Sequence, residues 1–382
     1  MQRLLATMML VAALLVTELG NAVQGQLPRM MAWSAYNLGT TGYNQAVAIG
    51  KVLKQNYGVT LRVLPAKNDV SRLMPLVKGR VQLSANGVAT YFAQEGVFQF
   101  ARRAWGPLPL RLVFTSNGDS NQSLAVAADT GVTTLAGLRG RRVPWVRGAP
   151  ALNVSTEAML ACAGLTWDDV KRVDFPGYNA MWNGVVNDQV DAAYATTVSG
   201  PTRKLEASPR GIFWPPLRHE DEGCWARLRE LAPYMTQHVG TRGAGISKAV
   251  PHEGGTYPYP LLIGLDRTPA DLVYATAAAI VKHYDEYKNA DPGAIGWAVE
   301  RQVRQWVVPW HEGAVRLLRE LDAWSDADQA HNERLLHRQL ILKQTWDAFV
   351  AINHSEGDIF ERAWRAKRVE ALEAAGMDPV WR

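Results

Sequence analysis

The sequence predicts an exported α/β protein of two lobes, followed by a helical extension. Three observations support this: an apolar leader, two successive series of alternating strand-like and helix-like segments, and a helix-only pattern after about residue 325. A length of 382 residues accommodates two domains of about 100–200 residues each. The composition, 47% hydrophobic and 20% charged, supports a buried core and excludes a disordered chain.

The charge distribution points away from nucleic acid. The chain has 41 Lys and Arg against 36 Asp and Glu, a net charge of +5 that is spread along its length. Nucleic-acid-binding proteins concentrate basic residues in one patch or stripe. We therefore expect no nucleic-acid partner, and the mild positive excess argues only weakly for an anionic partner.

The N-terminus is typical of a secretory signal peptide. Arg3 is followed by an apolar run, Leu4–Val16, and small or modest residues precede Gly25. The run is shorter than the ~20 residues that a membrane-spanning helix needs. We expect residues 1–25 to be a signal peptide, and the mature chain to be periplasmic, soluble and not embedded in a membrane.

The first lobe is predicted to begin at residue 26 and to run to residue 118. Strand-like runs alternate with helical periodicity, which predicts a largely parallel sheet with helices on both faces. The expected strands are Arg29–Ala35, Thr60–Leu64, Val81–Ala85 and Leu110–Thr115, and the expected helices are Gly42–Tyr57 and Asp69–Val77.

A second lobe is predicted over residues 119–222, inserted between parts of the first. Its expected strands are Leu124–Ala127, Val143–Val146, Lys171–Phe175 and Ala192–Ala195, and its expected helices are Thr134–Leu138, Asn153–Ala163 and Ala180–Val186. Residues 223–324 then return to the first lobe and the hinge, with strand Leu261–Leu265 and helix Pro269–Tyr287. Two lobes joined by crossing segments leave a cleft, where ligand sites are common.

Residues 325–382 are expected to form the C-terminal helical extension. Ser325 is a candidate N-cap, since Asp326 and Asp328 follow in the first turn. A second helix is expected over Ile359–Ala375, ending at Gly376. The simplest role is a helical cap on the first lobe, and the alternatives are assembly or bracing of the lobes.

The turn after the first strand is the first candidate binding site. Thr40, Thr41, Gly42 and Tyr43 open a helix whose first N–H groups have no partner within the helix. Such amides, with threonine hydroxyls beside them, suit a carboxylate or another anion. No Lys-Ser/Thr pair follows the glycines, so the turn is not a P-loop. A capped helix with no ligand is the alternative.

The second lobe repeats this geometry after its strand Val143–Val146. Arg147 is positioned to offer a guanidinium to a carboxylate, and Asn153 or Ser155 is expected to cap the next helix. A solvated surface arginine is the alternative for Arg147. Asn86 and Tyr178 follow other predicted strands and complete the expected ligand site.

The sequence offers little for catalysis. It contains no G-x-S-x-G elbow, H-E-x-x-H helix, P-loop or C-x-x-C pair, so we expect neither an enzyme nor a cofactor. The run His219–Glu222 is interpreted as a solvated acidic loop, and we expect no metal site. Cys162 and Cys224 either form a disulfide in an oxidising compartment or are two buried small residues.

Four stretches resemble the TAXI family, the solute receptors of a subclass of TRAP transporters. They occur in the family's order, within about residues 29–324: Leu38–Tyr43, Gly137–Val143, Asp271–Tyr274 and Pro309–Ala314. The sequence departs from the family pattern at Asn68–Arg72, at Gln82 and at Gly148–Pro150. These departures fall at expected pocket positions, so the ligand could differ from the glutamate-like or dicarboxylate ligands of some relatives.

The resemblance implies a type II periplasmic-binding-protein-like fold that closes on a ligand and docks on a membrane permease. The expected ligand is a small organic anion, with a carboxylate favoured, and the expected partners are TRAP permease subunits. The alternatives are a receptor for an ABC importer or for a membrane sensor and, from another class, an exported metal-dependent hydrolase.

Overall fold

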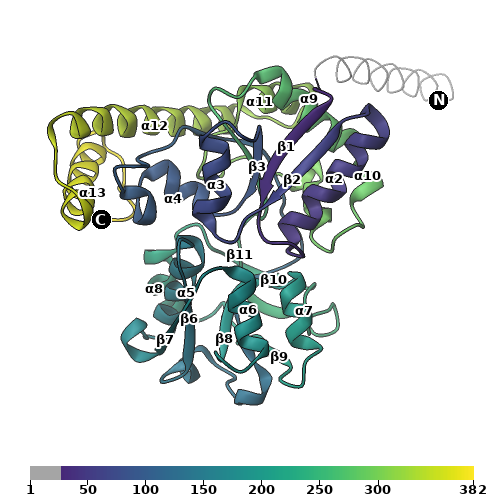
Figure 1. Ribbon diagram of the computed structural model, residues 1–382, viewed down its shortest axis with the longest axis vertical. Helices are drawn as coiled ribbons and strands as arrows, with labels where there is room; N and C mark the ends of the chain where they lie inside the picture. Colours follow the sequence, from purple (N-terminus) through teal and green to yellow (C-terminus); the bar gives the residue numbers. More distant parts are fainter. Residues whose placement is uncertain (1–26) are drawn as a thin grey trace.

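The protein was examined as a computed structural model that describes residues 27–382, so the predicted signal peptide lies outside the described residues. Two α/β lobes lie one above the other in Figure 1, and a helical extension projects from the upper lobe. The chain crosses between the lobes after residue 115 and again after residue 256. The predicted two-lobe α/β fold with a C-terminal helical extension is confirmed.

The first lobe is built on a five-stranded sheet of order β2-β1-β3-β12-β4. Its strands are β1 (Met30–Ala35), β2 (Thr60–Pro65), β3 (Leu83–Asn86), β4 (Leu110–Thr115) and β12 (Leu261–Leu265). The strand β1 is parallel to both β2 and β3, whereas β12 is antiparallel to its neighbours β3 and β4. The sheet is therefore mixed, because β12 enters from the second lobe and runs against the strands beside it.

Six helices belong to the first lobe. They are α2 (Thr41–Tyr57), α3 (Asp69–Val77), α4 (Ala89–Glu95), α9 (Ala270–Lys282), α10 (Tyr284–Tyr287) and α11 (Glu312–Glu320). A capping box between Asn68 and Ser71 starts α3, since each side chain accepts the other's backbone N–H. The single helix predicted over Pro269–Tyr287 is instead the pair α9 and α10, interrupted at His283.

The second lobe contains the remaining strands and four helices. They are β5 (Gln122–Ala127), β6 (Arg142–Val146), β7 (Lys171–Phe175), β8 (Ala192–Thr196), β9 (Ile212–Phe213), β10 (Thr236–Gly240), β11 (His252–Thr256), α5 (Pro150–Cys162), α6 (Tyr178–Val186), α7 (Gly200–Glu206) and α8 (Glu222–Leu231). The lobe extends past the predicted end at residue 222. It reaches Thr256, because α8 packs on α5 and β11 lies beside β5.

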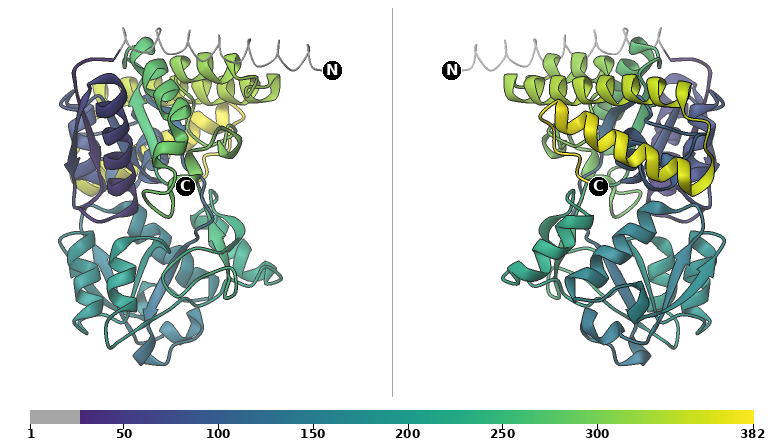
Figure 2. Two further views of the ribbon diagram at one scale, coloured as in Figure 1. Left: turned by 90° about the vertical axis from the view of Figure 1, so that its right-hand side faces the viewer. Right: turned by 90° about the vertical axis from the view of Figure 1, so that its left-hand side faces the viewer.

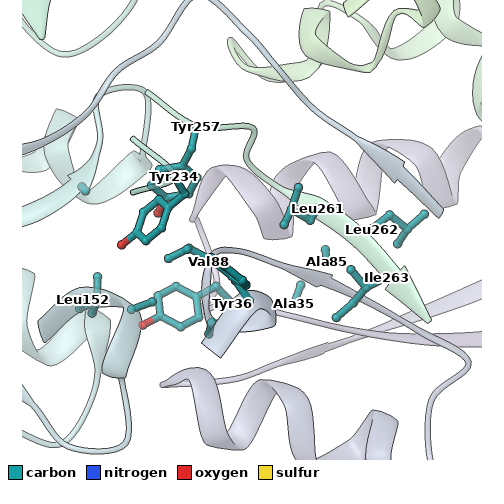
Figure 3. Close-up of a cluster of buried hydrophobic side chains, with 14 of the residues drawn as sticks. Ala35, Tyr36, Ala85, Val88, Leu152, Tyr234, Tyr257, Leu261, Leu262 and Ile263 are labelled. Carbon is teal, nitrogen blue, oxygen red and sulfur yellow. The ribbon is translucent and has the colours of Figure 1, made fainter. Parts of the chain in front are cut away.

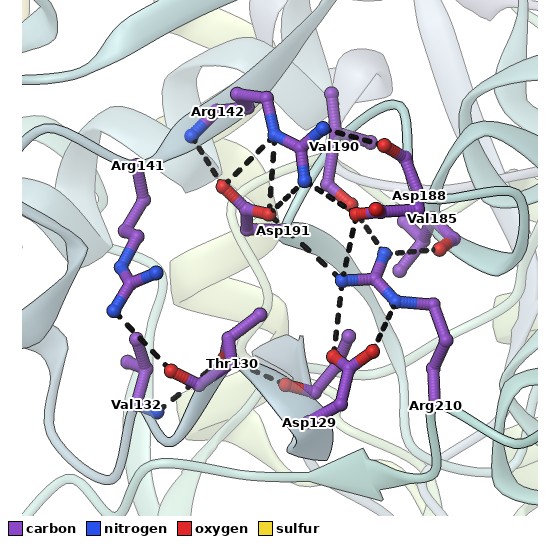
Figure 4. Close-up of polar contacts among 11 residues, drawn as sticks. Asp129, Thr130, Val132, Arg141, Arg142, Val185, Asp188, Val190, Asp191 and Arg210 are labelled. Carbon is purple, nitrogen blue, oxygen red and sulfur yellow. Dashed lines mark hydrogen bonds and ion pairs between the residues drawn. The ribbon is translucent and has the colours of Figure 1, made fainter.

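A network of ion pairs joins the strands β6 and β8 (Figure 4). Arg142 binds the carboxylates of Asp188 and Asp191, and Arg210 binds Asp188 and Asp129. Arg142, the first residue of β6, is therefore engaged within its own lobe. In the same lobe, the disulfide Cys162–Cys224 ties the end of α5 to the start of α8.

The C-terminal extension consists of α12 (Asp326–Ile352) and α13 (Gly357–Ala374), which lie side by side in Figure 2. Ser325 caps α12 with a capping box, as predicted. Glu95 at the end of α4 is fully buried and pairs with Arg338 of α12 at 2.7 Å and with Arg368 of α13. Trp381 packs on Phe92 and donates its indole N–H to the Leu231 carbonyl of α8. The extension thus caps the first lobe and also contacts the second.

Candidate functional site

A small cavity of about 40 Å³ lies between the two lobes. The strand ends and helix starts of both lobes supply its walls, which places it where ligand contacts depend on how the lobes are arranged. The lining residues are Tyr36, Thr40, Thr41, Asp69, Arg72, Gly87, Val88, Gln122, Ala151, Leu152, Tyr178, Tyr194, Ala195, Thr196, Ser199, Tyr257 and Tyr259.

Arg72 and Asp69 are the charged residues of this lining. Both lie on α3, with 2% and 1% of their surface exposed, and the Arg72 Nη2 to Asp69 Oδ1 distance is 2.7 Å. The other carboxylate oxygen of Asp69 accepts the backbone N–H of Ala151 at 2.9 Å. Ala151 is in the first turn of α5, so Asp69 connects the first lobe to a helix N-terminus of the second.

The arginine keeps hydrogen-bonding capacity after this pairing. Its Nε and Nη1 atoms are buried and have no partner within residues 27–382, and the same is true of the Tyr36 and Tyr194 hydroxyls. Buried polar groups are ordinarily paired, because an unmet one costs about 1–3 kcal/mol. These donors, clustered at one cavity, indicate a site for a hydrogen-bond acceptor.

Five tyrosines contribute to the wall of the cavity. Figure 3 shows Tyr36 and Val88 of the first lobe facing Leu152 of the second, with Tyr257 above them. The Arg72 guanidinium lies 4.4 Å from the centre of the Tyr36 ring, a cation–π contact. Gly87 allows close packing here, since a Cβ at this position would lie 3.0 Å from the Tyr259 ring.

Burial controls the ionisation of these groups. It raises the pKa of Tyr36 well above the ordinary value and also raises the pKa of Tyr259, which the nearby Arg72 partly opposes. Both phenols stay protonated at neutral pH and can donate. Burial also raises the pKa of Asp69, against the opposing effects of Arg72 and the Ala151 amide.

Three predicted site residues lie in the cavity lining: Thr40, Thr41 and Tyr178. The Thr40 hydroxyl donates to the Asn37 carbonyl at 2.7 Å, and the Thr41 hydroxyl donates to Asp291. The Tyr178 hydroxyl lies 3.0 Å from Ser199 Oγ, and its ring is 4.9 Å from the ring of Tyr36.

Two other predicted residues from the first turn lie next to this lining. Gly42 is within the first turn of α2, where a Cβ would lie 3.2 Å from the Tyr259 hydroxyl. Tyr43 is half-buried and packs against the hydrophobic core.

Four predicted residues lie outside the cavity lining within the described chain: Asn86, Arg147, Asn153 and Ser155. Arg147 is exposed, and its carbonyl accepts the Asn68 side-chain N–H at 2.9 Å. The Asn86 side chain accepts the N–H of Gly87, and Ser155 Oγ lies 3.3 Å from the Tyr234 hydroxyl. These contacts are internal to the protein.

The predicted helix cap in the second lobe is wrong. The helix α5 begins at Pro150 with Ala149 as its N-cap, so Asn153 and Ser155 lie within the helix. Proline suits the first helical position because the missing N–H would have had no partner there. The Asn153 side chain instead bonds both the N–H and the carbonyl of Val146.

Asp69 and Arg72 were not predicted individually as site residues, although their stretch Asn68–Arg72 was expected at the pocket. A local signal was available: Arg72 lies three positions after Asp69 on the predicted helix Asp69–Val77, and such a pair shares one helix face. Nothing in the sequence indicated that this face would be buried against the second lobe.

The remaining expectations concern metals and membranes. Residues 27–382 hold no group of three or more side chains arranged to bind a metal ion. Asp221 of the acidic run instead caps α8 by accepting the N–H of Cys224. Among the helices of the described chain, none combines the length and the apolar character of a membrane span.

Residues 58–219 match a family model described as NMT1/THI5 like. No curated protein sequence matches the chain. Membership of the TAXI family stays a prediction. The architecture itself, two α/β lobes joined by two crossings, is the periplasmic-binding-protein-like fold that the sequence predicted.

Several solved structures are similar to this chain at low identity. A protein from Bordetella bronchiseptica RB50 is 16% identical with a TM-score of 0.47, over 80% of this chain and 98% of that one. The alkanesulfonate-binding protein of Xanthomonas axonopodis pv. citri, bound to MOPS, is 16% identical with a TM-score of 0.42, over 85% and 93%. The periplasmic aliphatic sulphonate binding protein of Escherichia coli is 12% identical with a TM-score of 0.42, over 92% and 89%.

Proposed function

We propose that this protein is an extracytoplasmic solute-binding protein that captures a small organic anion, with a carboxylate favoured, between its lobes. The observation that carries the proposal is Arg72, which is 2% exposed and lines the cavity with two buried nitrogens free of partners within residues 27–382. A buried arginine with unmet donors is suited to an anion.

The position of the cavity supports capture by closure. Thr40, Thr41 and Arg72 line it from the first lobe, and Tyr178 and Ser199 line it from the second. A ligand that contacts both lobes stabilises the arrangement in which all its contacts are made together. Binding, rather than turnover, is the activity that this arrangement serves.

The test is native mass spectrometry of the purified mature protein, followed by calorimetry with a panel of organic acids. We expect an organic anion to bind, and Arg72→Met to weaken that binding by at least about 100-fold through loss of charge-assisted hydrogen bonds. The control is Arg147→Met, which removes an exposed arginine outside the lining and is expected to leave affinity unchanged. Stoichiometric metal, or conversion of a bound compound, would favour the hydrolase alternative.

The proposed partner is a TRAP-type permease, in keeping with the four TAXI-like stretches. An ABC-type importer is the second candidate, because a two-lobe binding protein suits either kind of partner. Transport assays in vesicles separate the two partners. Uptake driven by an ion gradient without ATP supports the TRAP partner, whereas uptake that requires ATP supports the ABC importer.

A further inference from the structure

We propose that the ligand is a monocarboxylate with a short uncharged body, and that Asp69 is the residue that limits it to one negative charge. This inference rests on the proposed function and concerns the same cavity. It follows from the charges that line the cavity, from the partners of Asp69 and from the available space.

Two charged side chains line the cavity. Asp69 and Arg72 are the ionised pair of the lining, joined at 2.7 Å, and the other lining side chains are apolar or neutral polar groups. Asp69 also accepts the Ala151 N–H at the positive end of α5. Asp69 therefore interacts with the positive end of α5 as well as with Arg72. Its charge neutralises Arg72 only in part, so Arg72 can still attract one ligand carboxylate.

A second ligand carboxylate would have no cation to meet it. Burying an unpaired charge costs several kcal/mol, so a dicarboxylate is disfavoured even where its first carboxylate binds well. Removing the Asp69 charge would leave Arg72 unopposed in the cavity. The same pocket would then tolerate a dianion better.

A free α-ammonium group is disfavoured for a related reason. The natural acceptor would be Asp69, which already pairs with the Arg72 cation at 2.7 Å and accepts the Ala151 N–H, so an ammonium there would lie beside a like charge. The partnerless hydroxyls nearby, those of Tyr36 and Tyr194, are better suited to a carboxylate oxygen, to which they can donate.

The space limits the size of the body. The cavity of about 40 Å³ is narrow, so it favours a compact ligand when the walls do not move. The tyrosine rings provide an apolar surface for a short alkyl group.

Calorimetry with three acids of equal carbon number tests the proposal. Propionate has an uncharged tail, malonate has a second carboxylate and L-alanine has an α-ammonium group. We expect propionate to bind at least about 10-fold more tightly than malonate or L-alanine, since only it avoids an unpaired charge. Equal or tighter binding of malonate or L-alanine, or no binding of propionate, overturns the proposal.

The variant Asp69→Asn tests the role assigned to that residue. We expect the ratio of propionate to malonate affinity to fall by at least about 5-fold, because the freed Arg72 charge favours the dianion. A merely structural role would weaken both acids together, so an unchanged ratio in a folded variant overturns the role of Asp69. If the variant does not fold, the native ratio still decides whether the cavity selects monoanions.

The outcomes also separate this inference from the proposed function. If another organic anion binds the native protein and Arg72→Met abolishes that binding, the function stands and only the ligand class is wrong. If no organic anion in the panel binds the native protein, or if Arg72→Met leaves the affinity of a bound anion unchanged, the proposed function itself fails.

Discussion

Two contacts made by the first lobe use different chemistry. The first, here called the interlobe seam, consists of Lys67–Val70 of the first lobe with Arg147–Ala151 and Tyr178 of the second. Its bonds are backbone or side-chain-to-backbone contacts, such as Val70 N–H to the Gly148 carbonyl at 3.1 Å and Tyr178 N–H to the Lys67 carbonyl at 3.0 Å. The second, here called the C-terminal anchor, consists of Glu95, Arg338, Arg368 and Trp381, and it is buried and aromatic.

The difference indicates which contact can open. Hydrogen bonds at the seam exchange readily for hydrogen bonds to water, so each contributes only about 0.5–1.5 kcal/mol net. Breaking the anchor would leave ionised groups uncompensated in the protein interior. We therefore expect the lobes to separate at the seam, beside the cavity, while the anchor holds the extension on the first lobe.

The largest expected effect comes from Arg368→Met in the anchor. Glu95 would lose one of its two cationic partners while remaining buried, and breaking such a pair costs about 3–5 kcal/mol. Chemical denaturation measures this loss of unfolding free energy. The control Arg365→Met removes an exposed arginine from the same helix and should change stability by less than about 0.5 kcal/mol. Equal effects of both variants would contradict the contrast between anchor and surface.

A somewhat smaller loss is expected for Trp381→Ala. The indole packs against Tyr91, Phe92 and Phe98, and its removal should cost about 3 kcal/mol of unfolding free energy. The conservative variant Trp381→Phe keeps the packing but loses the bond to the Leu231 carbonyl, at 3.1 Å, so about 1 kcal/mol is expected. If both variants lose the same stability in thermal unfolding, the aromatic packing contributes little.

The seam is tested by Asn68→Ala. Asn68 caps α3 and donates to the Arg147 carbonyl, so its removal should cost about 1–2 kcal/mol of unfolding free energy. We also expect a larger radius of gyration in solution scattering, because one seam contact is lost. Ser325→Ala removes the capping box of α12, away from the seam, and serves as the matched control. It should lower stability to a similar extent without opening the lobes.

The smallest effect concerns pH. Glu95 is desolvated by burial, which favours protonation, but its hydrogen bonds and ion pairs with Arg338 and Arg368 outweigh this and lower its pKa below the usual range of a glutamate. The stabilisation is present above the unfolded pKa and is lost as the pH falls through the folded pKa. One carboxyl group contributes a slope of at most about 1.4 kcal/mol per pH unit. Between pH 6 and pH 3, the unfolding free energy of Glu95→Gln should therefore fall less steeply than that of the unmodified protein.

Elements with strong local patterns were predicted well. The strands at Leu110–Thr115, Lys171–Phe175 and Leu261–Leu265 have the predicted bounds. The first and the third are largely apolar runs, which leave few alternatives. The strands β10 and β11 were missed. Their segments, Thr236–Gly240 and His252–Thr256, are rich in glycine and polar residues, and they are stabilised by pairing with each other across the chain.

In the candidate site, too, residues with a local sequence signal were predicted better than residues whose burial depends on distant segments. The glycines and hydroxyls of the turn after the first strand predicted Thr40 and Thr41 as site residues, and both lie in the cavity lining. Arg147 had an equally reasonable local argument, yet its side chain is exposed. Asp69 and Arg72 had only their spacing on one helix and their place in the stretch Asn68–Arg72, which did not reveal their burial. That burial comes from α5 of the other lobe, whose Ala151 lies 82 residues after Asp69 in the sequence.

By itself, the sequence determined the order of most strands, the division into two lobes and the helical end of the chain. Periodicity, caps and turn residues act over a few positions, so these features can be read locally. Only the tertiary structure decided which arginine faces the cavity and that Cys162 pairs with Cys224. The burial of Arg72 and the pairing of the two cysteines both depend on how segments distant in the sequence pack together and exclude water. No local sequence pattern contains that information.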